Sequence, residues 1–200
     1  MLKHVDPSYC GFIDETPKFS PALYLENLYF RNCRFFKRIH ESITSLSKLV
    51  TLNLEGCETL EKLPINFFML KSLEVLNLSG SKTLEEIPDL SASSNLKKLC
   101  LRECNRLRII YDSTGPSLDK LVTLDLKGCE NLKKLPSNSL VLNSLEFLNL
   151  SRCIDLEEIP DLSTASKLKE LYLKESYRLR IIHDLLNSLE FLNLRMLPII

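Results

Sequence analysis

Residues 49–64 read LVTLNLEGCETLEKLP, and the spacing of their leucines recurs from one end of the chain to the other. The stretch reduces to LxxLxLxxCxxLxxLP. In a segment xLxLx, the two leucines point to one face of a strand and the residues beside them point to the other. The sequence therefore predicts a short strand, a turn at Cys57, and a return segment that ends at Pro64, where proline prevents the hydrogen bonding from continuing.

The first leucines of eight such copies follow one another at steps of 24, 24, 23, 25, 24, 23 and 21 residues. These leucines are Leu25, Leu49, Leu73, Leu96, Leu121, Leu145, Leu168 and Leu189. A weaker copy starts near Leu2, with Pro7 at a strand position where it cannot donate a hydrogen bond. The period and the spacing match the leucine-rich repeat consensus. We expect a single leucine-rich repeat domain over residues 2–200, with about nine turns, of which the first and last are incomplete.

The predicted fold is an α/β leucine-rich repeat solenoid, which is a curved right-handed superhelix with a parallel concave sheet of about eight to nine short strands. One turn cannot bury its apolar edge alone, so neighbouring turns must stack to form a continuous core. The convex segments are too short and too polar for long helices. We therefore expect 3₁₀ turns and irregular backbone on that side.

A longer period lies above the single repeat. Residues 49–112 match residues 121–184 at an offset of 72, with identity at 41 of the 64 positions. Packing alone would fix only the leucines, so this identity indicates duplication of a block of three turns, named A, B and C. The chain reads B, C, A, B, C, A, B, C and then a short turn. Because Leu2 is expected in the core and residues 197–200 are apolar at the other end, we expect a fragment, or a gene product cut from a longer ancestor.

The net charge limits the kinds of partner that the protein can bind, and the cysteines indicate the cellular compartment. The 26 basic and 26 acidic residues give a net charge of zero, which argues against a nucleic-acid or membrane-surface binder, and no apolar run is long enough to span a membrane. One slot after each strand holds a cysteine, or a serine at Ser81 and Ser176. Such a slot requires a small group that donates weakly to a backbone carbonyl, so we expect free thiols and a reducing compartment, the cytoplasm or the nucleus. The cysteines are Cys10, Cys33, Cys57, Cys104, Cys129 and Cys153.

The sequence contains no motif typical of a catalytic, nucleotide-binding or metal-binding site. No GxxxxGK[ST] or GxGxxG motif is present, and the cysteines recur near 24 residues apart rather than in the short pairs that bind zinc. The three histidines, His4, His40 and His183, stand far apart. We expect no enzyme activity, no catalytic residue, no cofactor and no metal site.

Strand alternation predicts three columns of residues on the concave surface, which begin at Asn27, Tyr29 and Arg31. The third column holds five cations against the single acid Glu55, a net charge of +4. Aromatic and cationic residues are enriched in protein interfaces, so we predict a recognition strip; the alternative is an ordinary solvated face. The candidate partner-binding residues are Tyr29, Arg31, Arg102, Lys127, Phe147, Tyr172, Lys174, Phe191 and Arg195.

The segments LNLEGCETLEKLP at 52–64 and LKKLCLRECNRLRII at 96–110 resemble the leucine-rich repeat region of plant intracellular immune receptors, in particular the class with TIR and NB-ARC domains (TIR-NBS-LRR). The resemblance implies recognition of a pathogen effector or a guarded host protein, and autoinhibition through the NB-ARC domain of the same receptor. It also implies a role in plant defence without nucleotide binding by these 200 residues. Two alternatives remain open: a generic cytosolic scaffold or adaptor, and the substrate-recognition part of a ubiquitin ligase.

Overall fold

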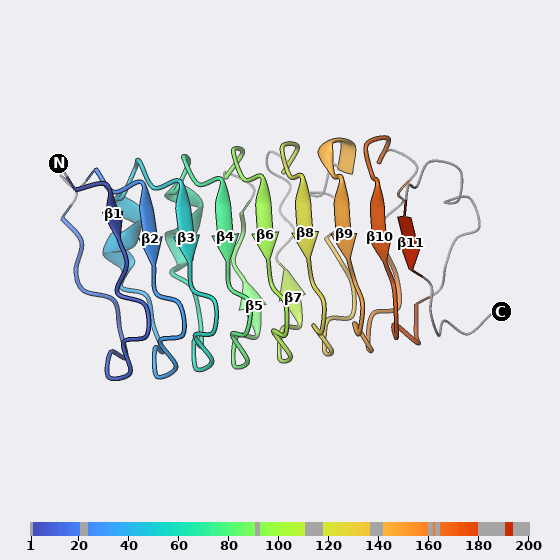
Figure 1. Ribbon diagram of the computed structural model, residues 1–200, viewed down its shortest axis with the longest axis horizontal. Coiled ribbons are helices and arrows are strands. Elements are labelled where there is room, and N and C mark those ends of the chain that lie inside the picture. The colour runs from blue at the N-terminus through green and yellow to red at the C-terminus, as the bar shows by residue number, and fades with distance from the viewer. Residues whose placement is uncertain are drawn as a thin grey trace.

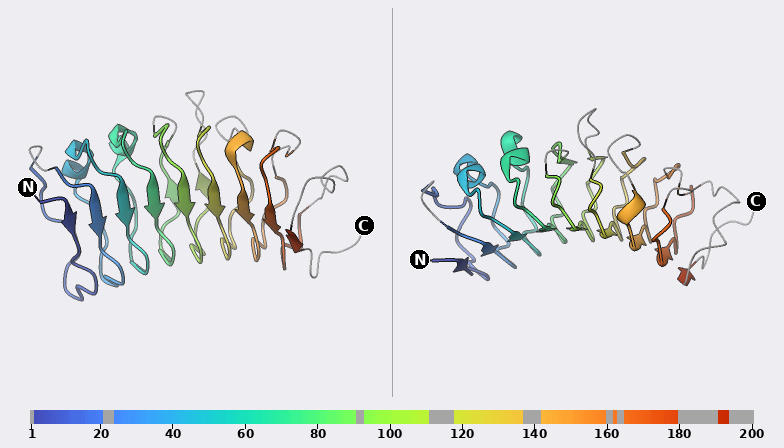
Figure 2. Two further views of the ribbon diagram at one scale, coloured as in Figure 1. Left: turned by 45° about the horizontal axis from the view of Figure 1, so that its top comes forward. Right: turned by 90° about the horizontal axis from the view of Figure 1, so that it is seen from above.

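The computed structural model describes residues 2–20, 24–90, 93–110, 118–136, 142–159, 162, 165–179 and 191–193. Successive turns of the chain each place one short strand on the same face, so that β1 to β4, β6 and β8 to β11 follow one another along the molecule (Figure 1). The 3₁₀ helices η1 and η2 lie on the opposite side (Figure 2). This arrangement is the parallel solenoid that the leucine spacing predicts.

The main sheet has nine parallel strands in the order β1-β2-β3-β4-β6-β8-β9-β10-β11, which confirms the predicted sheet. Each strand is only two or three residues long, because the repeat supplies one LxL segment per turn. The strands are β1 (His4–Val5), β2 (Asn27–Tyr29), β3 (Thr51–Asn53), β4 (Val75–Asn77), β6 (Lys98–Cys100), β8 (Thr123–Asp125), β9 (Phe147–Asn149), β10 (Glu170–Tyr172) and β11 (Phe191–Asn193).

The core is a row of leucines contributed by the strand centres. Leu52 of β3 pairs in register with Leu28 on one side and Leu76 on the other, and the same register continues along the sheet. These side chains are at most 1% exposed. Burying a leucine stabilises a fold by about 1.5–3 kcal/mol, so stacking of adjacent turns supplies most of the stability. The remaining members of the row are Leu99, Leu124, Leu148 and Leu171.

Leu2, which precedes β1 at the edge of the sheet, is not buried as the sequence predicts. This residue is 58% exposed, so the prediction that it is a core leucine is wrong. Among the described residues, strand β1 pairs with β2 alone. Val5, which follows in the same strand, is only partly buried against the core.

The convex side carries 3₁₀ helices, as the short polar segments predict. They are η1 (Glu41–Ser45), η2 (Ile65–Met69) and η3 (Leu142–Ser144), and the described ranges contain no α-helix. The His40 imidazole caps η1 by accepting a hydrogen bond from the Ser42 amide over 3.1 Å. Ile43 of η1 and Phe67 of η2 are fully buried and tie the two helices to the core. No helix in the described part of the chain is long and apolar enough to cross a membrane.

A smaller set of β contacts, which the sequence analysis did not predict, lies in the return segments. Strand β5 (Glu86–Ile87) pairs in parallel with β7 (Ile109–Ile110). Isolated bridges join Arg38 to residues of both neighbouring turns, Glu15 and Lys62. The return segments therefore stack in register as the main strands do, and they form a second flank of the solenoid.

The cysteine slot has the geometry that its tolerance of serine predicts. The Cys57 thiol donates to the carbonyl oxygen of Phe30, 3.0 Å away in the preceding turn. Ser176 makes the equivalent bond to Leu150 over 2.6 Å. The Ser81 hydroxyl is buried and has no partner. All seven cysteines are free thiols, and those in the slot that bond in this way are Cys33, Cys57, Cys104, Cys129 and Cys153.

The residue before the slot adopts the left-handed conformation in every described turn. Only three of these eight residues are glycine, for example Gly56 at φ 74°, although this region costs other residues about 1–2 kcal/mol. A Cβ on Gly56 would lie 3.3 Å from the Cα of Asn32 in the turn before. The other members are Tyr9, Asn32, Gly80, Glu103, Gly128, Arg152 and Glu175.

Candidate functional site

The strand register places the concave columns as the alternation of side chains predicts. In the first column, Phe147 lies between Thr123 and Glu170, and in the second, Cys100 lies between Asn77 and Asp125. The third column continues beyond the strands through backbone hydrogen bonds of neighbouring turns, such as Gly80 N to Arg102 O at 2.6 Å and Glu103 N to Lys127 O at 2.7 Å. The three columns therefore form one continuous surface.

The asparagines of the second column support the backbone. The Asn77 Oδ1 atom accepts the amide of Ser79 over 3.0 Å, and Asn53, Asp125 and Asn149 each bond in the same way to the residue two positions on. These side chains close the strand end in the manner of an Asx turn. Their oxygens are already engaged, so the column is less available to a partner than its polarity suggests.

In the turns where Tyr29 and Cys100 replace this asparagine, the preceding turn supplies the missing acceptor. The amide of Arg102, two residues after Cys100, donates to Ser79 Oγ over 3.3 Å. The amide of Arg31 donates to Ser8 Oγ over 3.1 Å in the same arrangement. In these two C-type turns, a serine of the B-type turn before each therefore accepts the amide hydrogen bond.

Acids lie beside three of the predicted basic residues. Arg31 pairs with Asp6 at 2.8 Å, and Lys174 with the adjacent Glu175 at 3.2 Å. Hydrogen bonds from Ser8, followed by the Arg31 contact, lower the pKa of Asp6. The positive potential of the third column is therefore weaker than its formal charge of +4 indicates.

Arg102, the third of these cations, lies 3.7 Å from the Asp125 carboxylate. Asp125 is 8% exposed, and burial raises its pKa, while the cationic side chains of Arg102, Lys127 and Lys98 act in the opposite direction. Burial likewise raises the pKa of the Cys100 thiol. The middle of the concave face therefore contains a nearly buried carboxylate surrounded by cations.

The predicted aromatic residues fall into two separate places. The rings of Phe147 on β9 and Tyr172 on β10 lie 5.5 Å apart at 43°. The Tyr172 hydroxyl donates to Glu170 over 2.8 Å, and this bond raises the pKa of Tyr172. At the other end of the sheet, the Arg31 guanidinium lies over the Tyr29 ring, 5.4 Å from its centroid.

The structure thus brings Phe147 and Tyr172 together with Lys174 of the same turn as Tyr172, and it holds Tyr29 and Arg31 apart from them. The side chain of Phe191 and the whole of Arg195 lie outside the described residues.

A groove of about 510 Å³ crosses the concave face over strands β4 to β10. Sequence reasoning did not select several of its lining residues, because it chose the aromatic residues and the cations of the third column and passed over acids, Cys100 and the first-column Lys98. These residues are Glu55, Lys98, Cys100, Asp125 and Glu170. The concave columns contained all five, but which of them border a hollow depends on the sizes of their neighbours.

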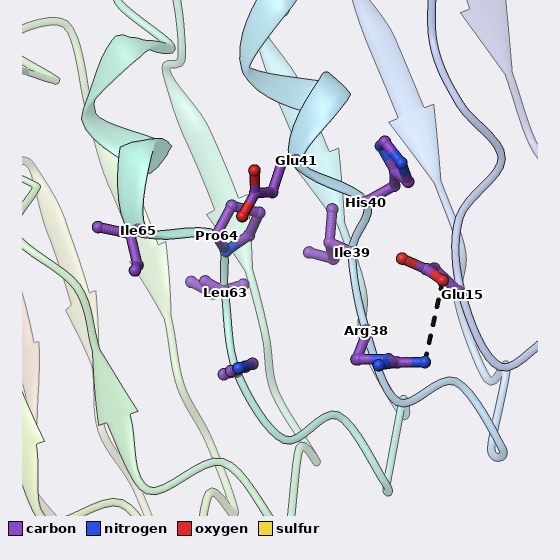
Figure 3. A pocket seen from close by; sticks show the side chains of 9 residues that line it. Glu15, Arg38, Ile39, His40, Glu41, Leu63, Pro64 and Ile65 are labelled. Carbon is purple, nitrogen blue, oxygen red and sulfur yellow. Dashed lines mark ion pairs between the residues drawn. The ribbon is translucent and has the colours of Figure 1, made fainter.

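Two further hollows lie on the return flank, away from the three columns. One of about 360 Å³ lies beside η1 and η2 (Figure 3), where Arg38 pairs with Glu15 at 4.0 Å and the nearly buried Ile39 and Leu63 form part of the lining. The other, of about 730 Å³, is lined by charged side chains around Ile109. Among the described residues, no group of three histidines, cysteines or acids is placed to hold a metal ion.

No protein-family model matches the chain. The chain is 40% identical to Disease resistance protein RPP5 of Arabidopsis thaliana over 82% of its own length and 12% of that protein. It is 32% identical to Protein SUPPRESSOR OF npr1-1, CONSTITUTIVE 1 of the same plant, over 76% of this chain and 10% of that one. It is 31% identical to Putative disease resistance protein At4g19050, over 92% and 16% respectively. The chain therefore spans 10% to 16% of the length of these relatives.

The leucine-rich repeat domain of the type III effector XCV3220 (XopL) has a similar structure, with a TM-score of 0.56 at 21% identity. The match covers 88% of this chain and 70% of that one. At this identity the likeness concerns the fold alone, which it confirms as a leucine-rich repeat solenoid. The sequence identities show that the chain belongs to the leucine-rich repeat region of the plant disease resistance proteins.

Proposed function

We propose that the chain is the protein-recognition part of a plant intracellular immune receptor of the TIR-NBS-LRR class, acting in the cytoplasm or the nucleus. Its concave sheet binds a protein, which is a pathogen effector, a guarded host protein or the NB-ARC domain of the same receptor. Binding to the NB-ARC domain holds the receptor inactive. No catalytic step is assigned to these residues, and signalling belongs to other domains of the receptor.

The observation that carries the proposal is the pair formed by Phe147 and Tyr172. Two aromatic rings lie 5.5 Å apart on the concave face, and Phe147 also lines the groove. Aromatic rings supply a large contact area at little cost in side-chain entropy, and tyrosine is enriched among the residues that dominate binding energy. Lys174 follows Tyr172 by two residues and pairs with Glu175 at 3.2 Å, so the turn of Tyr172 also carries charges of both signs.

The balance of charge favours a protein as the partner. Arg31, Arg102 and Lys174 each have an acid within 4 Å, so the face presents mixed charges instead of a basic stripe. Mixed charges select among protein partners by complementarity. Nucleic acid binding requires a concentrated positive surface.

The test is a two-hybrid screen of plant and pathogen protein libraries with the 200-residue chain, followed by affinity measurements on each purified interactor. The Phe147→Ala/Tyr172→Ala double variant is compared with Tyr177→Ala. Tyr177 is a matched control because it is 48% exposed and lies in the turn after β10, outside the three columns. We expect the double variant to weaken binding at least about tenfold, which corresponds to about 1.4 kcal/mol, with little change for the control.

Two results contradict the proposal. Interactors that bind the double variant as tightly as the original chain would show that the concave pair is not the recognition surface. Interactors that consist of ubiquitin-ligase components and their substrates would favour the ligase alternative over an immune receptor.

A further inference from the structure

The groove over Cys100 lies where the equivalent turns carry an aromatic ring. Cys100 belongs to a C-type turn, and the same second-column position is Tyr29 in the previous C-type turn and Tyr172 in the next. Cysteine is much smaller than tyrosine, and Cys100 lines the 510 Å³ groove while being 8% exposed itself. The groove thus lies over a position of the repeat that holds a tyrosine ring in the two other C-type turns.

The turn that contains Tyr29 shows how such a ring is held. The Arg31 guanidinium lies 5.4 Å from the centroid of the Tyr29 ring and at the same time pairs with Asp6 at 2.8 Å. A guanidinium can therefore cover a ring and keep an ion pair. Arg102 is the equivalent of Arg31 in the Cys100 turn, and it has its own acid, Asp125, at 3.7 Å.

We propose that the groove over Cys100 is a socket for an aromatic side chain, tyrosine in particular, of the protein that binds the concave sheet. The inference rests on the proposed function and names the chemistry of the partner. The incoming ring lies over Cys100 in the position that Tyr29 occupies in its own turn, and the Arg102 guanidinium covers its face.

Charge complementarity supports this occupant. The face of an aromatic ring carries negative charge density and attracts a guanidinium. Lys98, which also lines the groove, places a second cation beside the ring. The groove is further lined by the carboxylates of Glu55, Asp125, Glu146 and Glu170, which can accept a phenol hydroxyl as Glu170 accepts that of Tyr172. These acceptors favour tyrosine over phenylalanine.

The groove is also continuous with the proposed recognition strip, since Phe147 lines it and contacts Tyr172. A partner whose aromatic residue enters the socket therefore also covers the Phe147 ring. Both features belong to one interface.

The first test uses N-acetyl-L-tyrosinamide as the probe and ¹⁵N-labelled chain in reducing buffer. We expect saturable shifts of the amides of Cys100, Arg102 and Asp125, and at least about tenfold weaker binding of N-acetyl-L-leucinamide. Cys100→Tyr fills the socket and abolishes these shifts, whereas Cys100→Ser keeps the affinity within about twofold. Cys100→Tyr is expected to fold because tyrosine occupies the equivalent position in two other turns.

Arg102→Gln provides a test that leaves the socket open and does not depend on the folding of Cys100→Tyr. Loss of the guanidinium is expected to weaken tyrosinamide binding about threefold or more. The proposal is overturned if tyrosinamide gives no saturable shift, if Cys100→Tyr still binds it, or if leucinamide binds equally well.

The two proposals fail in different ways. If tyrosinamide does not bind while Phe147→Ala/Tyr172→Ala still removes the protein interactors, the socket is wrong and the recognition surface stands. If tyrosinamide binds but Cys100→Tyr leaves the affinity of every protein interactor unchanged, the socket is not used by the partner and this inference is wrong.

Discussion

The Cys129 thiol donates a hydrogen bond to the carbonyl oxygen of Leu101, 3.0 Å away in the preceding turn. This contact recurs from turn to turn and joins each strand end to the next. The Ser81 hydroxyl occupies the same slot but is buried without a partner. A single slot therefore contains both a stabilising contact and a local defect.

Ser81→Cys is expected to stabilise the chain by about 1–3 kcal/mol, the cost of a buried hydroxyl without a hydrogen bond. The matched control is Ser176→Cys, because the Ser176 hydroxyl already bonds to Leu150 at 2.6 Å and has nothing to gain. Urea unfolding followed by circular dichroism measures both variants. Equal shifts for the two would contradict the assignment of Ser81 as the defect.

Gly56→Ala is expected to destabilise the chain by about 1–2 kcal/mol, since Gly56 has a φ of 74° and a new Cβ would approach the backbone of Asn32. Gly11→Ala is the control, because no atom lies within 4 Å of a Cβ there. That substitution should be neutral or stabilise by less than about 1 kcal/mol, through the unfolded state. Thermal unfolding distinguishes the two variants. A Gly56→Ala variant with the same melting temperature as the original chain would contradict the predicted backbone strain at Gly56.

Stability should fall at alkaline pH because of the buried thiols. Burial raises the pKa of Cys57, Cys104 and Cys153 to about 12 from an ordinary value of 9.0. The folded state thus keeps protons that the unfolded state loses, so the stabilisation is complete below pH 9 and is lost as the pH rises from 9 to 12. The expected loss is about 1 kcal/mol per thiol for each pH unit in this window.

Urea unfolding at pH 8, 9 and 10 measures this dependence. The control is a variant with all three cysteines changed to serine, whose unfolding free energy should vary less over the same range. A parallel decline in the original chain and the variant would assign the effect to other groups, such as lysines.

Leu124→Ala is expected to cost about 2–5 kcal/mol, because Leu124 is 1% exposed in the central row and the surrounding turns cannot close the cavity. Leu2→Ala should change stability by less than about 0.5 kcal/mol, because Leu2 is 58% exposed at the edge of the sheet. Both follow from equilibrium unfolding. A large loss of stability in Leu2→Ala would contradict the exposure of Leu2 and indicate that its side chain is buried.

The leucine period alone predicts most of the fold. The strand of Leu52, the buried cysteine slot and the 3₁₀ helices follow from spacing, residue size and the lack of helical runs. The exposure of Leu2 could not be predicted this way, because the spacing identifies a position and says nothing of whether a neighbouring turn covers it. The pairing of Glu86 with Ile109 was also missed, because two-residue bridges leave no periodic signal.

The candidate site was predicted less completely. The columns and the closeness of Phe147 to Tyr172 follow from strand alternation, because residues in adjacent strands share a face. The groove over Cys100 does not follow from alternation. It depends on the space that the small Cys100 side chain leaves between the larger residues that line the groove, such as Arg102. The ion pair of Arg31 with Asp6 was not predicted either, because it depends on side-chain conformations that the leucine spacing does not determine.

In two C-type turns, the amides of Arg31 and Arg102 donate to a serine of the B-type turn before them, and this contact bears on how the repeat array could lengthen. Because the amide of Arg102 takes its acceptor from Ser79, a crossing-over that inserted a turn between them, or deleted the B-type turn, would leave a backbone donor without its acceptor. A crossing-over that moved three turns keeps the pair together. The offset of 72 residues between the two internal copies is thus a length of recombination that keeps this contact, and it allows the array to lengthen while the residues of the concave columns diverge.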